Sequence, residues 1–186
     1  MRVLLIYYTG TFNTRYLSNQ LKEKLLKRGD TVDTVEINAN TPVADTYGYD
    51  LIGFSYPIYG FNSPLPFNQY VRKLKFYPTQ KYFIYKNSGE TLAMNNASSR
   101  ILIRLMKRRK VTFAGEYHYV MPYNIHFPFE KEFVKQILLY NQKLMAVMLH
   151  NLEHGVVFKI KSNIFYNTAA FFVGVQKIGG NVNSFL

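Results

Sequence analysis

The chain has 186 residues, of which 48% are hydrophobic, a formal net charge of +12 and no cysteine. This length suits one sizeable domain, and the apolar content is that of a protein with a packed core rather than a disordered chain. Without cysteine, disulfides, cysteine-ligated zinc and iron–sulfur clusters are excluded within these residues. No apolar run reaches the roughly 18 residues of a membrane span, and no signal-peptide pattern opens the chain, so a cytoplasmic location is expected.

Positive charge is distributed over several predicted helices rather than gathered in one arm. The densest group is the run Lys107-Arg108-Arg109-Lys110, which falls where a helix is expected to end and where cations interact favourably with the helix dipole. Two interpretations stay open for it, a solvated helix end and a docking site for an acidic partner. The 16 Tyr and 15 Phe residues lie mostly inside apolar runs, which favours core packing over base stacking, so no nucleic-acid partner is expected.

Apolar runs alternate with helical patterns along the chain. Uninterrupted apolar runs are typical of strands buried on both faces of a parallel sheet. They predict strands over residues 3–8, 50–55, 81–86 and 112–121, with a shorter, partly exposed strand over 32–37. Apolar residues at helical spacing predict helices over residues 14–28, 64–74, 95–109, 131–153 and 167–178. Gly29 is expected to cap the first of these helices.

Strands that alternate with helices of about 10–15 residues indicate βαβ units and a parallel sheet. We therefore predict an α/β fold with a doubly wound, five-stranded parallel sheet, for which the spacing permits the order 2-1-3-4-5, and an extra C-terminal helix. Residues 1–155 would form the sheet domain, and residues 156–186 a C-terminal helical extension or linker. In this topology a ligand binds at the carboxyl ends of the strands beside the switch point, where the loops after strands one, three and four converge.

The loop after the first strand reads Thr9-Gly10-Thr11-Phe12-Asn13-Thr14. It lacks the Gly-x-Gly-x-x-Gly pattern of dinucleotide-binding folds and the terminal Gly-Lys-Ser/Thr of a P-loop. Its hydroxyl and backbone N–H groups, with the positive end of a helix dipole behind them, predict a phosphate site that requires neither Lys nor Mg²⁺. The alternative is an ordinary helix N-cap at Asn13 or Thr14.

Two further loops would complete the site. The second, Tyr56-Pro57-Ile58-Tyr59-Gly60-Phe61, offers an aromatic ring that could stack on a flat heterocycle, and its Tyr59-Gly60 peptide could reorient if Gly60 adopts a positive φ. The alternative is an aromatic turn that packs on the next helix. The third, Asn87-Ser88-Gly89-Glu90, offers backbone N–H groups and the Asn87 amide to ring carbonyls, or is an ordinary turn.

These loops resemble those of the flavodoxin-like proteins, and more narrowly the flavodoxin module of bacterial flavodoxin–ferredoxin fusion proteins. The resemblance covers roughly residues 1–155. It rests on residues 9–14, which match the family's Ser/Thr-Gly-Thr-Gly-Asn-Thr, and on residues 53–60, 87–89 and 121–124. It implies a bound FMN, with the phosphate on the first loop and the isoalloxazine between the second and third. The cofactor-binding residues that it implies are Thr9, Gly10, Thr11, Phe12, Asn13, Thr14, Pro57, Ile58, Tyr59, Gly60, Asn87, Ser88, Gly89 and Asn124, with Tyr59 in the ring-stacking position.

The chain departs from this resemblance in two places. Phe12 stands where the family's phosphate loop usually has Gly. If the position requires a positive φ, a Phe there costs on the order of 1 kcal/mol or more; the alternatives are a negative φ with Phe12 turned outward, or weaker FMN binding. In the fusion proteins, a helical linker resembling residues 171–185 leads into a Cys-rich ferredoxin module, which this chain lacks. The chain is then either an excised part of a longer protein or a natural form without that module.

The resemblance implies an FMN-dependent electron-transfer domain, with an acidic ferredoxin or a fused ferredoxin module as a candidate partner. One alternative is an NAD(P)H-dependent FMN or quinone reductase, whose nicotinamide site would lie in residues 123–129. Another is a module of the same fold that has lost flavin binding. Because Glu90 and Asp50 are the only acidic residues around the three loops, the reduction potential of a bound flavin is expected to exceed that in an acidic flavodoxin.

No catalytic side chain or metal site is expected from the sequence. The four histidines pair with no nucleophile pattern. His150 and His154 stand four residues apart on one predicted helix, which is a metal-ligand spacing, but the sequence offers no third ligand. The chemistry would therefore belong to the flavin, and the protein would supply binding and electrostatics.

Overall fold

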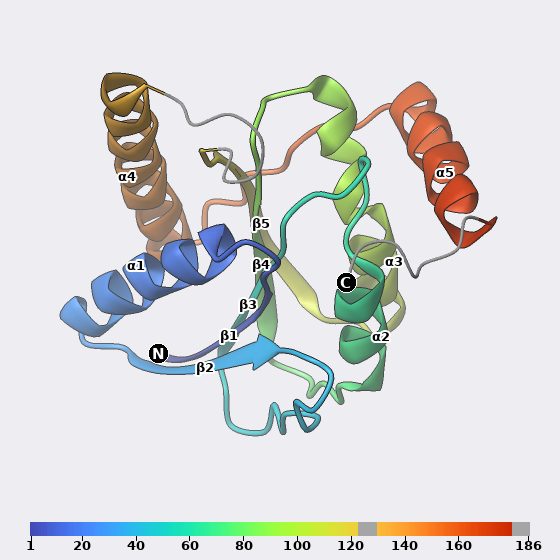
Figure 1. The fold of residues 1–186 in the computed structure, drawn as a ribbon. Helices are drawn as coiled ribbons and strands as arrows, with labels where there is room; N and C mark the ends of the chain where they lie inside the picture. Colours follow the sequence, from blue (N-terminus) through green and yellow to red (C-terminus); the bar gives the residue numbers. More distant parts are fainter. Residues whose placement is uncertain (123–129, 180–186) are drawn as a thin grey trace.

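The computed structural model describes residues 1–122 and 130–179. β1 (Arg2–Tyr8), β2 (Thr31–Ile37), β3 (Leu51–Ser55), β4 (Lys81–Ser88) and β5 (Thr112–Val120) form a five-stranded sheet in the order β2-β1-β3-β4-β5. All pairings of neighbouring strands are parallel, which confirms the predicted topology. Figure 1 shows α1 (Asn13–Lys27) and α4 (Lys131–His154) on one side of this sheet, and α2 (Leu65–Lys73) and α3 (Arg100–Arg108) on the other.

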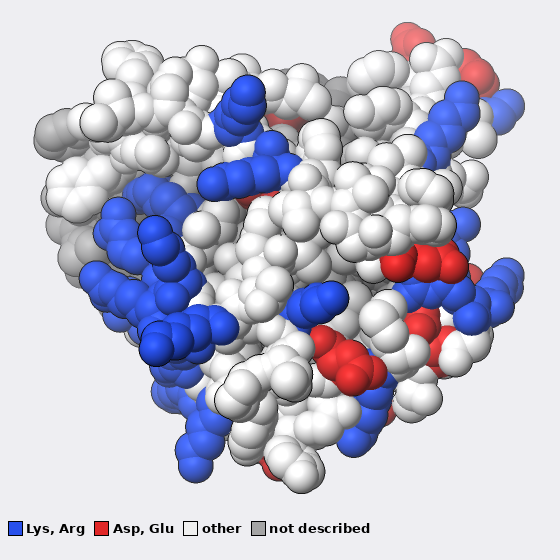
Figure 2. Space-filling view, turned by 180° about the vertical axis from the view of Figure 1, so that it is seen from behind, with Lys and Arg blue, Asp and Glu red and all other residues white. Residues whose placement is uncertain are grey.

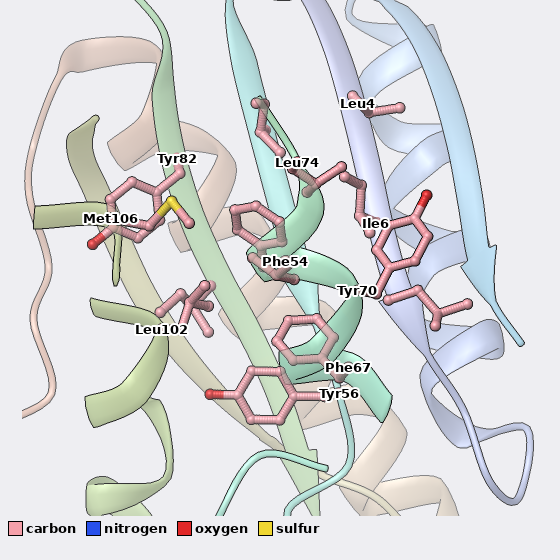
Figure 3. Packing of buried hydrophobic residues seen from close by; sticks show 14 of the residues in the cluster. Leu4, Ile6, Phe54, Tyr56, Phe67, Tyr70, Leu74, Tyr82, Leu102 and Met106 are labelled. Atoms are coloured by element: carbon pink, nitrogen blue, oxygen red, sulfur yellow. The ribbon is translucent and has the colours of Figure 1, made fainter. Parts of the chain in front are cut away.

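The layer between the sheet and α2 and α3 is the larger of the two hydrophobic clusters (Figure 3). Leu4 and Ile6 of β1 and Phe54 of β3 meet Phe67 of α2 and Met106 of α3, and each of these side chains is at most 1% exposed. Phe54 and Phe67 lie edge to face, with ring centroids 6.2 Å apart. Burying a side chain of this size stabilises the fold by roughly 1.5–3 kcal/mol, so α2 and α3 are firmly attached to the sheet.

The opposite face of the sheet carries the residues that alternate with these. Val3 and Leu5 of β1 point toward α1, where they pack with Leu17 and Leu21, and Met145 of α4 joins the same cluster. Both faces of β1 are therefore buried. This explains why its sequence is continuously apolar rather than alternating.

The predicted elements are confirmed in order, and three boundaries are corrected. β4 continues to Ser88, because Asn87 and Ser88 pair in register with Tyr119 and Val120 of β5. The single helix predicted over residues 95–109 is a 3₁₀ helix, η1 (Ala93–Ser99), followed by α3. The last helix, α5 (Ile164–Gly179), begins three residues before the predicted start at 167.

Gly29 ends α1 as predicted. It adopts φ 91°, and the N–H groups of Gly29 and Asp30 donate to the carbonyl oxygens of Leu26 and Leu25 over 3.0 and 3.1 Å. This is the Schellman pattern, in which a left-handed residue after the helix satisfies its last carbonyls.

The segment after α4 crosses the free edge of β5. Glu116 N–H donates to the carbonyl of Phe158 over 2.8 Å, Gly115 and Phe158 form a parallel bridge, and the Phe158 ring stacks on Tyr117 with centroids 5.5 Å apart. α5 then packs against η1. Among residues 1–122 and 130–179, no helix has both the length and the apolar character needed to cross a membrane.

Candidate functional site at the carboxyl edge of the sheet

The first loop turns into α1 through Phe12. This residue adopts φ 66° and ψ −10° at the N-cap position. Of the alternatives left open by the sequence, the structure therefore shows the positive φ, and its side chain is 63% exposed. The guanidinium of Arg15 lies 4.7 Å from the centre of the Phe12 ring. A left-handed non-glycine residue costs on the order of 1 kcal/mol, and this cation–π contact offsets part of it.

The N-terminus of α1 is left without a side-chain cap, and its first turn holds no acidic residue. The predicted caps serve other purposes: Asn13 Nδ2 donates to the Pro122 carbonyl over 2.8 Å, and the Thr14 hydroxyl accepts a hydrogen bond from Asn87. Beside them, the hydroxyl oxygen of Thr9 is buried with no hydrogen-bond partner in the described part of the chain. An uncapped helix start and an unpaired buried hydroxyl are features of a site for an anion.

Asn87 joins all three loops. Its amide Nδ2 donates to Thr14 Oγ1 over 2.8 Å, its carbonyl accepts the N–H of Ile58 at 2.8 Å, and its own N–H donates to the Tyr56 carbonyl at 3.1 Å. Because Asn87 is 2% exposed, these bonds are shielded from water. The Asn87 amide is thus directed at the first loop, and the groups that the end of β4 offers to a ligand begin at Ser88.

The second loop is a tight hairpin-like turn from Tyr59 to Asn62. The two residues exchange backbone hydrogen bonds of 2.9 and 3.1 Å, while Gly60 and Phe61 between them adopt φ 52° and 61°. Two consecutive positive φ values define a type I′ turn, so Gly60 adopts the positive φ on which reorientation of the Tyr59-Gly60 peptide depends. The Asn62 amide donates to the Gly60 carbonyl over 2.7 Å and to the Ala170 carbonyl of α5 over 2.9 Å, which fixes this loop to the C-terminal helix.

Tyr59 reaches across to the first loop. A Cβ added to Gly10 would lie 2.1 Å from the Tyr59 hydroxyl, so Tyr59 can keep its present position only beside a glycine. Tyr59 is 40% exposed, and its partial burial raises the pKa of its hydroxyl. A half-exposed aromatic ring at the mouth of the site is available to a planar ligand.

The end of β4 is held by a hydrogen-bond cluster around Ser88. Its hydroxyl donates to the Glu90 carbonyl and lies 2.7 Å from Nε2 of His118. The hydroxyl has one proton, so His118 Nε2 must be the donor, and the neutral imidazole carries its proton on Nε2. Burial, with the nearby Lys86 charge, lowers the pKa of His118 to about 4, which is consistent with a neutral ring.

A buried ion pair lies next to this cluster. Lys86 Nζ is 2.7 Å from Glu116 Oε1, and both side chains are at most 1% exposed. Lys86 also donates to the Asn95 carbonyl and the Ser99 hydroxyl, each over 3.1 Å, and burial lowers its pKa. Sequence reasoning missed this pair; the available signal was a charged residue inside each of two otherwise apolar strands.

The structure thus gathers most of the predicted site residues at one edge of the sheet. Residues 9–14, 57–60 and 87–89 lie on the three loops that Asn87 joins, whereas Asn124 and the predicted nicotinamide segment, 123–129, fall outside the described residues. His150 and His154 lie away from this edge on α4 and stack with ring centroids 4.2 Å apart. Within the described residues, no group of three His, Cys, Asp or Glu side chains could hold a metal ion.

This topology, with its site at the switch point, defines the flavodoxin-like fold. No protein-family model and no curated protein sequence matches the chain, but solved structures do. An archaeal flavodoxin is similar with a TM-score of 0.55 and 10% identity, over 83% of this chain and 100% of that one. The flavodoxin of Streptococcus pneumonia TIGR4 has a TM-score of 0.52 and 16% identity, over 79% and 99%. An NADPH-quinone reductase from P. pentosaceus has a TM-score of 0.54 and 12% identity, over 77% and 96%.

Proposed function

We propose that this chain is an FMN-binding electron-transfer domain. The observation that carries the proposal is the first loop, where a helix N-terminus without a side-chain cap stands beside the Thr9 hydroxyl, which is buried and has no hydrogen-bond partner among residues 1–122 and 130–179. A doubly charged phosphate would complete both, because it accepts hydrogen bonds from the helix N–H groups and from a hydroxyl. The flavodoxin structures that share the fold support the same assignment.

The residues present fit FMN with one rearrangement. Thr9 and the first turn of α1 would hold the phosphate, and Tyr59 would stack on the isoalloxazine, whose polar edge would meet the backbone of residues 88–89. Tyr59 now lies against Gly10, so its side chain must move outward for the ring to enter. The part of Tyr59 that moves is the free end of a half-exposed side chain, so this motion requires no change in the core.

Bound FMN would supply the capacity to accept and release electrons one at a time. The protein's part is to bind and orient the group and to set its surroundings. Asn87 holds the three loops at a fixed separation, the Ser88 cluster holds the end of β4, and Asn62 holds the second loop on α5. Such prior ordering reduces the entropy lost on binding.

The direct test is a visible spectrum of the purified full chain before and after addition of FMN, followed by titration calorimetry. Thr9→Val removes the hydroxyl at nearly constant volume. We expect it to weaken FMN binding by about tenfold, the worth of one hydrogen bond to a charged group. Riboflavin, which lacks the phosphate, is the matched ligand, and its binding should be unchanged by Thr9→Val. Absence of any bound or bindable flavin contradicts the proposal, as does equal weakening of both ligands.

Two other functions are distinguishable by the same preparation. The similarity to an NADPH-quinone reductase favours an enzyme as the second candidate, and oxidation of NAD(P)H by the FMN-loaded protein in the presence of a quinone would establish it. The strained Phe12 and the contact between Tyr59 and Gly10 favour a module without flavin. That third candidate requires that the protein leave the visible spectrum of added FMN unchanged and that FMN leave the melting temperature of the protein unchanged.

A further inference from the structure

A line of positive charge runs along the outer face of α3. Arg100, Arg104, Lys107 and Arg108 follow one another at i, i+4, i+7 and i+8, so they share one face of the helix, while Leu102 and Met106 on the other face are buried. Arg104, Lys107 and Arg108 are exposed and Arg100 is partly exposed. On the left of Figure 2, Lys and Arg side chains gather along this part of the molecule without Asp or Glu between them.

The line continues to the site through the C-terminal segment. The Asn96 amide of η1 donates to the Lys161 carbonyl over 3.1 Å, and Asn96 precedes Arg100 by about one helical turn. The exposed Lys161 therefore lies near the Arg100 end of this line of cations. We call these five residues, Arg100, Arg104, Lys107, Arg108 and Lys161, the α3 stripe. Because η1 follows directly on the loop after Ser88, the stripe starts next to the candidate flavin site.

The stripe is not neutralised within the fold. In residues 1–122 and 130–179, none of its cations forms an ion pair with an acidic side chain. The charges also oppose one another, since burial and the neighbouring Arg104 both lower the pKa of Arg100. Like charges four residues apart destabilise a helix, so Arg100 with Arg104 and Arg104 with Arg108 oppose the helix, whereas Lys107 and Arg108 in its last turn interact favourably with its dipole.

The neighbouring Arg109, in contrast, contacts the rest of the fold. Its guanidinium donates to the Leu74 and Arg72 carbonyls at the end of α2 and lies 5.5 Å from the centre of the Phe76 ring. It therefore stabilises the contact between two helices. The cluster predicted at residues 107–110 thus divides, with Arg109 serving the fold and Lys107 and Arg108 pointing away from it.

We propose that the α3 stripe is the docking surface for a redox protein with an acidic face, which would exchange electrons with the flavin beside Ser88. This inference rests on the proposed function, which it extends by locating the partner. A single helix of nine residues is about 14 Å long, a size that suits the small, transient interfaces of electron-transfer complexes. Opposite charges on the two surfaces would orient the partner and accelerate association.

A protein partner fits the stripe better than nucleic acid does. The residues interspersed with the cations on α3 are Ile101, Leu102, Ile103, Leu105 and Met106. α3 contains no aromatic side chain, so it offers bases nothing to stack on.

The test compares two variants with the same change of charge. Arg104→Glu/Arg108→Glu reverses two cations of the stripe, and Lys22→Glu/Lys27→Glu reverses two on α1, across the sheet. The probe is a plant-type [2Fe–2S] ferredoxin, a small acidic redox protein, titrated into the ¹⁵N-labelled full chain and followed by NMR. We expect shifts along α3, η1 and the loop after Ser88, with binding about tenfold weaker for the α3 variant and less than about threefold weaker for the α1 variant.

Other results overturn the inference. Equal weakening by both variants would mean that binding depends on net charge and not on the α3 stripe. Shifts confined to another face, or no saturable binding, would show that the stripe does not dock this partner. Tighter binding of a 12-nucleotide single strand, or of vesicles with anionic lipid, with the same dependence on α3 would assign the stripe to that ligand. Binding is measured without flavin, so failure of FMN to bind refutes the proposed function while the NMR map still decides whether the stripe docks an acidic protein.

Discussion

The Asn87 amide donates a 2.8 Å hydrogen bond to Thr14 Oγ1, and both side chains are at most 2% exposed. This contact joins the end of β4 to the first turn of α1 across 73 residues of sequence. It means that the first and third loops of the candidate site cannot move independently. The same residue holds the second loop through its backbone N–H and C=O groups, so one residue connects all three loops of the site.

Replacing Asn87 with Ala should therefore affect stability and ligand binding together. The change leaves the Thr14 hydroxyl buried without its donor, and we expect a loss of about 1–3 kcal/mol in the free energy of unfolding. Urea denaturation measures this loss, and FMN titration should show weaker binding in the same variant. Asn40→Ala, at an exposed position, is the control and should change neither. A variant with full stability and full affinity would show that the loops are held by other contacts.

Two glycines should respond differently to alanine. At Gly53 an added Cβ would lie 2.6 Å from Phe83 Cζ and 2.7 Å from Leu5 Cδ2, inside the packed core. We expect Gly53→Ala to cost about 1–3 kcal/mol of unfolding free energy. Gly10→Ala meets the free end of Tyr59 instead, which can turn outward, so its cost should stay below about 1 kcal/mol. Thermal or urea unfolding of both variants checks the order, and a larger loss at Gly10 would mean that Tyr59 is rigidly held.

His118 should make the fold sensitive to acid. Its pKa is lowered from 6.5 to about 4 in the folded protein, so above pH 6.5 the ring is neutral in both the folded and the unfolded chain and contributes no pH dependence. As the pH falls from 6.5 to 4, the unfolded chain takes up the proton first, and stability falls by about 3 kcal/mol. Urea unfolding at pH 7 and pH 4.5 measures this. His118→Gln should lose less stability over the same range, whereas the exposed His150→Gln should behave as the wild type.

The Lys86–Glu116 pair should show strong coupling. Lys86→Met leaves the Glu116 carboxylate buried without its counter-charge, which costs about 3–5 kcal/mol. Neutralising both residues, in Lys86→Met/Glu116→Gln, should restore most of that loss because no isolated charge remains. A double-mutant cycle by urea unfolding gives the coupling energy. Additive losses in the double variant would contradict the pairing seen between β4 and β5.

The reduction potential of the FMN-loaded protein is expected to lie above that of an acidic flavodoxin. Glu90 is the acidic residue on the loop after Ser88, and Asp50 lies at the opposite end of its strand, where it accepts the N–H of Arg2. Little negative charge therefore opposes electrons added to the ring. Glu90→Gln should raise the potential further, and Glu132→Gln on α4 should leave it unchanged. A spectroelectrochemical titration that finds a potential as low as in acidic flavodoxins would refute this expectation.

The sequence was sufficient to predict the sheet because both faces of its inner strands are buried. β1, β3 and β4 each contain an apolar run, and the helices between them have one apolar face. Strand number and direction therefore followed from periodicity and the βαβ rule, which also permitted the observed order. Phe12 was identified as the doubtful position of the phosphate loop. That its φ is positive required the structure, because a Phe at an N-cap says nothing of the turn that precedes it.

Contacts between residues far apart in the sequence were beyond prediction. The pairing of Lys86 with Glu116 depends on the register of β4 against β5, and that register shifts between Tyr82 and Phe83. Tyr59 and Gly10 each belong to a recognisable loop, but their contact depends on a type I′ turn in which a Phe takes a conformation usually left to Gly or Asn. The sequence identified which residues gather at the edge of the sheet, and only the structure shows which of them contact one another.

The pairing of Phe158 with β5 affects how readily one molecule could associate with another through this strand. An outer strand with free N–H and C=O groups is a template on which another molecule can add a strand and start an aggregate. The segment after α4 covers part of that template on β5, through the bond from Glu116 N–H to Phe158. Residues 156–163 therefore occupy part of the edge on which a strand of another molecule could pair. Protein cut after residue 155 should retain its sheet but tend to associate through the uncovered strand.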